Sequence, residues 1–173
     1  MSYTKIKINL QLLKYLLCNR ERDRGFTLIE LLVVIIILGI LVAVSLPNFI
    51  TQIGKSRETE AKNNLGAIAR SQQAYHFEKQ AFATDLSYLT INGSFASKYY
   101  NLPNPATAND TIVKHQAIAL NPNSDRVRNY AIGVYYNAGL FNMFFCQSLD
   151  VGIAVDVPDT TSGVCTNNGI RLE

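Results

Sequence analysis

Residues 25–47 read GFTLIELLVVIIILGILVAVSLP, and this stretch decides how the rest of the chain is organised. No charged residue occurs from Leu31 to Gly54, a run of 24 residues rich in Leu, Ile and Val. As a helix that rises about 1.5 Å per residue, the run is about 36 Å long, enough to cross a bilayer core of about 30 Å. The stretch therefore predicts a helix of membrane-spanning length.

One acidic residue, Glu30, lies at the edge of this run, four residues after Phe26. Charged side chains are rare in membrane-spanning segments because hydrocarbon does not solvate them, so an acid here indicates a function. The structural alternative is that Glu30 only caps the helix, since the positive end of the helix dipole favours an acid. Just upstream, residues 20–24 (RERDR) form a charged block that ends at Gly25.

The segment GFTLIE at residues 25–30, followed by an apolar helix and Leu46-Pro47-Asn48, resembles the prepilin signature of type IV pilins. The resemblance continues through residues 60–68 (EAKNNLGAI) and 71–75 (SQQAY), which are similar to pilins of the cyanobacterial branch. It extends to about Leu89, and beyond that point only the placement of the last two cysteines matches.

The resemblance implies that a prepilin peptidase removes a leader, residues 1–25, by cutting between Gly25 and Phe26, and that Phe26 is then N-methylated. It also implies that the pilus assembly machinery moves the subunit from the plasma membrane into an extracellular homopolymer. In that filament Glu30 would pair with the Phe26 amine of a neighbouring subunit. The helix between Gly39 and Pro47 would lose helicity on assembly. The family uses such fimbriae for motility, cell adhesion or DNA uptake.

The charges divide the chain at the same place. Residues 1–25 hold six Lys or Arg against two acids, net +4, whereas the chain from Phe26 onward holds ten against eleven, net −1. The basic leader should therefore stay on the cytoplasmic side. DNA is a conceivable partner, but a near-neutral body argues against a dedicated nucleic-acid binder. The leader itself fits either an amphipathic helix on the inner membrane face or a disordered segment.

The helix should continue past the apolar run, which we assign to residues 26–54, into a head domain at residues 55–173. Apolar residues recur at three- and four-residue steps as far as Tyr75, which predicts an amphipathic helical half ending near residue 78. Gly39 and Pro47 are weak points, and we expect a kink at residues 43–47.

Beyond a turn at residues 84–89 and a loop at residues 101–110, four apolar segments, of which residues 130–136 and 151–157 alternate, predict an antiparallel sheet of about four strands. The expected strands are residues 112–120, 130–136, 140–146 and 151–157, with a hairpin at residues 137–139. A long helix packed on such a sheet is an α+β fold.

Three cysteines are present, and Cys18 lies in the leader. Cys146 and Cys165 remain after cleavage, and an even pair in an exported domain favours a disulfide. Two buried free thiols are the alternative.

No motif for a catalytic site, a cofactor or a metal occurs in the sequence, so we expect a protein that is not an enzyme. His76 and His115 are expected to be structural. Asp150, Asp156 and Asp159 lack the glycine and the final Glu of a calcium loop.

Arg126 and Arg128 fit a solvated loop, with contact to DNA or an acidic partner as the alternative. The sequence thus favours a structural subunit of a type IV pilus. The alternatives are a minor pilin or a type II secretion pseudopilin and, more distantly, an uncleaved binding domain held by a single membrane anchor.

Overall fold

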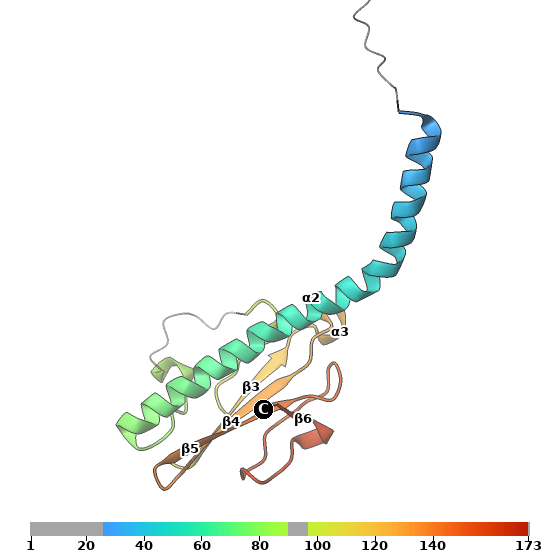
Figure 1. The fold of residues 1–173 in the computed structure, drawn as a ribbon. Coiled ribbons are helices and arrows are strands. Elements are labelled where there is room, and N and C mark those ends of the chain that lie inside the picture. Colours follow the sequence, from blue (N-terminus) through green and yellow to red (C-terminus); the bar gives the residue numbers. More distant parts are fainter. Residues whose placement is uncertain (1–25, 90–96, 173) are drawn as a thin grey trace, which may run out of the picture. The chain divides into compact units, whose positions relative to one another are not determined.

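Helix α2 is the longest element and runs Leu28–Lys79 (Figure 1). A computed structural model describes residues 26–89 and 97–172, and α2 accounts for 52 of them. The helix continues through Gly39 and Pro47, although Pro47 has no N–H to donate to the carbonyl of Ala43. The expected long helix is therefore confirmed, while the kink stays a prediction. The leader lies outside the described residues.

The chain divides into two compact units, residues 1–45 and 46–173. In the first unit the described residues are Phe26, Thr27 and the start of α2, and all of them are exposed. The second unit holds the remainder of α2 and every described strand. Along α2 the first buried residue is Gly54, and those that follow are Ala61, Leu65, Ile68, Ala69, Gln72 and His76.

The sheet is antiparallel, in the order β1-β3-β4-β5-β6, with β2 paired to β3. Its strands are β1 (Tyr100–Asn101), β2 (Thr107–Ala108), β3 (Ile112–Ala119), β4 (Tyr130–Asn137), β5 (Leu140–Gln147) and β6 (Ile170–Leu172). Short helices are η1 (Leu86–Tyr88), α3 (Pro122–Asp125) and η2 (Thr166–Asn168).

The hairpin between β4 and β5 forms where the sequence predicts it. Asn137 pairs with Leu140, so Ala138 and Gly139 make a two-residue turn with φ of 47° and 89°. Positive φ at both turn residues matches the twist of the flanking strands, and glycine adopts it without strain.

The second half of α2 lies along one face of the sheet (Figure 1). Ala61, Leu65 and Ala69 of the helix belong to one core cluster with β3 and β4 residues such as Val113 and Ile132. The opposite face carries a second cluster, in which Phe144 and Cys146 of the sheet meet Val155, Val157 and Cys165 of the C-terminal segment. The head is thus a three-layer arrangement of helix, sheet and covering loop.

This third layer corrects two predictions about the sheet. Residues 151–157 form no strand, because their backbone groups bond to side chains: Asn129 Nδ2 donates to the Ile153 carbonyl at 2.8 Å, and the Asp156 N–H donates to Thr166 Oγ1 at 2.7 Å. The loop expected at residues 101–110 is interrupted by the end of β1 and by β2. β6 is a strand that the alternation pattern missed.

Both histidines lie in a polar layer between α2 and the sheet. Gln72 exchanges two 2.9 Å hydrogen bonds with the backbone of Ala83, and its Nε2 also lies 3.0 Å from His115 Nε2. His76 Nε2 donates to the Asp110 carbonyl at 2.7 Å. These contacts give the two histidines a structural role, as expected.

Candidate functional site

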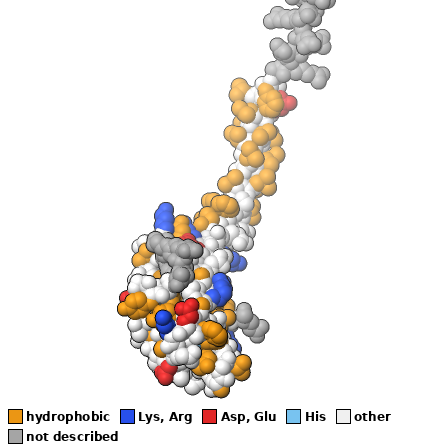
Figure 2. All heavy atoms as spheres, turned by 90° about the vertical axis from the view of Figure 1, so that its left-hand side faces the viewer, with side chains coloured by type: hydrophobic (Ala, Val, Ile, Leu, Met, Phe, Trp, Pro, Cys, Tyr) orange, Lys and Arg blue, Asp and Glu red, His pale blue; other side chains and the backbone are white. Residues whose placement is uncertain are grey.

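The first half of α2 is an exposed apolar surface (Figure 2). Its large side chains are exposed from 37% at Ile53 to 88% at Leu28. The most apolar 18-residue window of α2 has a mean hydropathy of 3.1, and α2 is the one described helix long and apolar enough to cross a membrane. Apolar surface of this extent marks a contact with lipid or protein.

Gly39 and Pro47, both predicted assembly residues, lie within this exposed surface. A Cβ placed on Gly39 would meet no atom within 4 Å, so the subunit itself does not require glycine there. If the absence of a side chain at Gly39 allows a close contact, that contact is with another molecule.

Thr27 and Glu30 form a capping box at the start of α2. The Thr27 N–H and its Oγ1 both donate to Glu30 Oε2 at 2.9 Å, and the Glu30 N–H donates to Thr27 Oγ1 at 3.3 Å. This reciprocal bonding satisfies donors that the first helical turn leaves free. The sequence signal for this cap is the spacing Thr-x-x-Glu at residues 27–30.

Glu30 Oε1 accepts no hydrogen bond from the described residues. A carboxylate has about four lone-pair sites, so the cap leaves one oxygen available to a second donor. Phe26, the other half of the predicted pair, is 74% exposed. The structure thus places Phe26 and Glu30 at one end of the apolar surface, while Gly25 lies outside the described residues.

Cys146 and Cys165 are joined by a disulfide, with their Cα atoms 5.8 Å apart. Cys146 lies in β5, and Cys165 lies in the covering loop directly before η2. The bond fixes that loop to the sheet face opposite α2, far along the chain from the apolar surface. Its role is therefore in the stability of the head.

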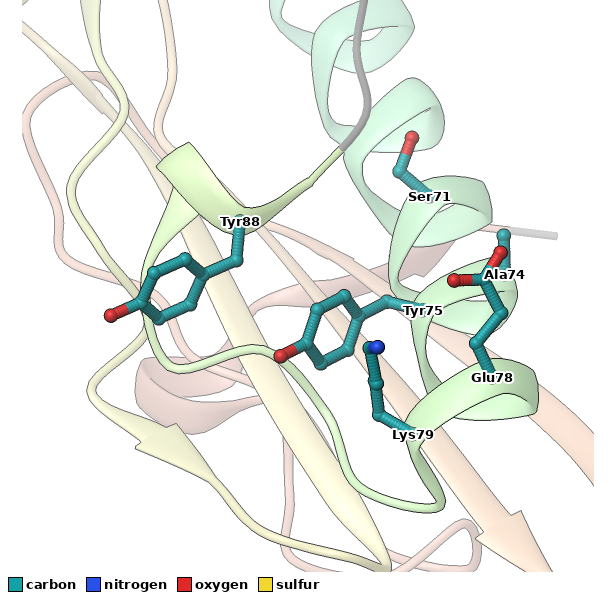
Figure 3. A pocket seen from close by; sticks show the side chains of 6 residues that line it. All are labelled: Ser71, Ala74, Tyr75, Glu78, Lys79 and Tyr88. Carbon is teal, nitrogen blue, oxygen red and sulfur yellow. The ribbon is translucent and has the colours of Figure 1, made fainter.

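A surface depression of about 400 Å³ lies beside the end of α2, between Tyr75 and Tyr88 (Figure 3). Tyr75 and Tyr88 lie side by side, with Lys79 next to Tyr75. Every lining residue is at least partly exposed. In residues 26–89 and 97–172 no three metal-binding side chains gather in one group. We assign no chemistry to this depression.

Comparison with known proteins decides the family. The family model for type IV pilin-like G and H proteins matches residues 58–167, which is the head, and the model for the prokaryotic N-terminal methylation motif matches residues 20–46. The chain belongs to the type IV pilin-like family. The match to the methylation motif covers most of the apolar surface of α2, and the match to the pilin-like model begins within the other half of the same helix.

Relatives of this pilin-like chain fall in two groups. The type IV major pilin protein PilA of Myxococcus xanthus is 38% identical over 99 residues, 56% of this chain and 43% of PilA. The fimbrial protein EcpC of Eikenella corrodens is 34% identical over 82 residues, 47% of this chain and 54% of EcpC. The type II secretion system core protein G of Pseudomonas aeruginosa is 38% identical over 64 residues, 37% of this chain and 45% of that protein. The chain spans about half the length of these relatives.

Proposed function

We propose that this chain is the structural subunit of a type IV pilus. A prepilin peptidase removes residues 1–25, the new N-terminal Phe26 is methylated, and the subunit waits in the plasma membrane until the assembly machinery adds it to an extracellular filament. The observation that carries the proposal is the exposed apolar half of α2, which has an acid in its first turn and overlaps the methylation motif at residues 20–46. The filament would serve motility, adhesion or DNA uptake.

Assembly needs a force other than the hydrophobic effect. Lipid tails are as apolar as the side chains of this helix, so moving the helix from lipid into a filament core gains little from burial. Packing and electrostatics must select the filament. The residues from Leu31 to Gly54 carry no charge, which leaves Glu30 as the charged group of this half.

The amine created at Phe26 is the partner that Glu30 needs. A buried carboxylate is costly unless it is paired with an opposite charge, and an amine that carries one methyl group stays charged. An incoming subunit can present this amine to Glu30 of a subunit already in place, which would set the axial register of the filament. Capping does not prevent such pairing, because Oε2 holds the cap and Oε1 stays available.

Two variants separate capping from pairing. Glu30→Gln keeps an acceptor oxygen for Thr27 but removes the charge, whereas Thr27→Val removes the capping hydroxyl and keeps the carboxylate. We expect Glu30→Gln subunits to be inserted and cleaved but almost absent from filaments sheared off the cells. Thr27→Val subunits should assemble close to wild-type levels.

The measurement is quantitative mass spectrometry of sheared filaments and of membranes, with the mass of the N-terminal peptide as an internal check on cleavage and methylation. If Glu30→Gln enters filaments normally while Thr27→Val does not, Glu30 acts only as a cap. If the extracellular chain still carries residues 1–25, the uncleaved anchored domain takes the place of the pilus subunit.

The second candidate is a pseudopilin of a type II secretion system, which the similarity to core protein G favours. Abundance distinguishes the two. A major pilin is the dominant protein of long surface filaments, whereas a minor pilin or a pseudopilin would be recovered in small amounts or not at all. If the chain is a pseudopilin, deletion of its gene should impair protein secretion rather than motility or adhesion.

A further inference from the structure

A basic groove of about 240 Å³ lies in the head at the point where the apolar run of α2 ends. Lys55 of α2 and Arg126 and Arg128 of the loop after α3 line it, together with Thr51, Glu58 and Val151. Three of these six residues are bases and one is an acid, although the chain from Phe26 onward carries a net charge of −1. Positive charge is therefore concentrated here.

The loop that carries the two arginines is clamped to α2. A Cβ on Gly54 would lie 2.8 Å from the carbonyl oxygen of Arg126, so the backbone of the loop touches the helix at the glycine. Arg57 Nη1 donates to Asp125 at 3.0 Å (Oδ1) and 3.1 Å (backbone O), and the Arg128 N–H donates to Glu58 at 3.1 Å.

Arg57 and Glu58 lie three and four residues after Gly54, so all three residues are on one side of α2. Arg57 pairs with Asp125, whereas Glu58 accepts a backbone N–H and remains the one acid against three bases in the groove. Within the described part of the chain, Lys55, Arg126 and Arg128 form no ion pair. The groove thus holds three bases at fixed positions, ready for an anion from outside the subunit.

The location of the groove along α2 indicates which anion it meets. The residues from Leu31 to Ile50 already span the hydrocarbon core at about 1.5 Å per residue, for a core of about 30 Å. Thr51 and Lys55 then follow within about 8 Å, which is the depth of the headgroup layer. In a membrane-inserted subunit the groove opens among lipid phosphates.

We propose that this groove binds the phosphate of anionic phospholipids in the outer leaflet of the plasma membrane and holds the head against the bilayer until the subunit is extracted. The inference rests on the membrane-inserted stage of the proposed function. Arginine is suited to this role because its planar guanidinium donates two parallel hydrogen bonds to a phosphate. DNA offers the same group, but the anchored helix keeps lipid phosphate next to the groove at high effective concentration.

The test uses the full-length chain in lipid nanodiscs that contain phosphatidylcholine with or without phosphatidylglycerol. A photoreactive group on the phosphatidylglycerol headgroup cross-links to residues in reach, and peptide mass spectrometry locates the products. The variant is Arg126→Gln/Arg128→Gln. The control, Arg70→Gln/Lys79→Gln, removes the same charge from exposed positions further along α2.

We expect cross-links on the peptides that hold residues 55 and 121–128. They should fall at least about fivefold in the Arg126→Gln/Arg128→Gln variant, since each base near an anionic surface contributes about a factor of five. The control variant should match the wild type. At 1 M salt, where the screening length is about 3 Å, the wild-type signal should also fall.

Equal cross-linking in the variant and the wild type would overturn the inference and leave the proposed function intact. Loss of binding to a short DNA duplex in the variant, with lipid cross-links unchanged, would likewise overturn it and assign the groove to DNA. A chain that fails to enter nanodiscs at all would overturn both the inference and the proposed membrane pool.

Discussion

The disulfide between Cys146 and Cys165 offers the most quantitative test of the fold, because it joins two layers of the head. Cys146 is fully buried in β5, and Cys165 is 5% exposed in the covering loop. The loop buries Val155 and Val157 against the sheet without strand pairing of its own. Replacing both cysteines by alanine removes the covalent tie and leaves these apolar contacts and a few hydrogen bonds to hold the loop.

The expected loss follows from the length of chain that the bond closes. The two cysteines are 19 residues apart in sequence. Closing a loop of that length lowers the entropy of the unfolded chain enough to stabilise the fold by about 3 kcal/mol. For a domain of this size each kcal/mol corresponds to about 4 °C, so the melting temperature should fall by about 12 °C.

The assay compares three samples of the full-length chain in one detergent: the wild type, the wild type with a reductant, and Cys146→Ala/Cys165→Ala. Reduction breaks the tie without changing the buried side chains, so it separates the cross-link from the packing of the cysteines. Thermal unfolding followed by circular dichroism gives the midpoints. Hydrogen exchange should accelerate in residues 148–169 and β6 more than in β3 and β4.

Two results would refute this reasoning. Alkylation of both thiols in the unreduced protein would mean that the bond does not form. If the double-alanine variant melts at the wild-type temperature, removing the cross-link does not raise the entropy of the unfolded chain appreciably. The other contacts of the loop would then be enough to hold it.

Two further predictions concern the contact of α2 with the sheet. Alanine favours a helix over glycine by about 1 kcal/mol, so Gly66→Ala, which meets only the flexible end of Arg70 at 3.5 Å, should raise the melting temperature. Gly54→Ala should lower it, because its Cβ would lie 2.8 Å from the Arg126 carbonyl oxygen; thermal unfolding of both variants checks the opposite signs. Burial lowers the pKa of His115 from 6.5 to about 4, so the unfolded chain takes up a proton more readily than the fold does. Stability should be full above pH 6.5 and fall by up to about 3 kcal/mol between pH 6.5 and about 4, and urea unfolding of His115→Gln against the wild type should show a smaller acid loss.

Local signals predicted the parts of the fold that local interactions determine. The hairpin at residues 137–139 needed two residues of positive φ, and Gly139 next to a small residue supplied them. The long helix followed from its apolar run and from the three- and four-residue spacing beyond it. β3, β4 and β5 are each eight residues long and rich in apolar residues, long enough for a strand signal to be read from the sequence.

The failure at residues 151–157 has a different cause. Alternation there correctly indicated that one side of the segment is buried, since Val155 and Val157 pack on the sheet. It carried no information about the backbone partners, which are the side chains of Asn129 and Thr166, 24 and 10 residues away from the groups they bind. β6 has three residues, too few for any period, and its pairing with β5 depends on the chain having first crossed the sheet.

The candidate site divides in the same way. Phe26, Glu30, Gly39 and Pro47 could be selected from the sequence because they belong to one continuous stretch. The contact of Arg57 with Asp125 could not be predicted, because 68 residues separate them in the sequence. The basic groove likewise could not be predicted, because Arg126 and Arg128 line it together with Lys55 only when the fold brings their loop to Gly54.

The exposure pattern of α2 bears on the proposed role of Glu30 in assembly. Upstream of Gly54 no residue of the helix is buried, and the large apolar side chains are exposed in every direction around its axis. A helix that is apolar all round fits surroundings that enclose it on all sides, rather than a single seam. A bilayer and the centre of a helical filament both provide such surroundings. The apolar side chains therefore discriminate weakly between the two, and the choice falls to Glu30, whose charge is hydrated at the membrane surface and needs a partner once that water is gone.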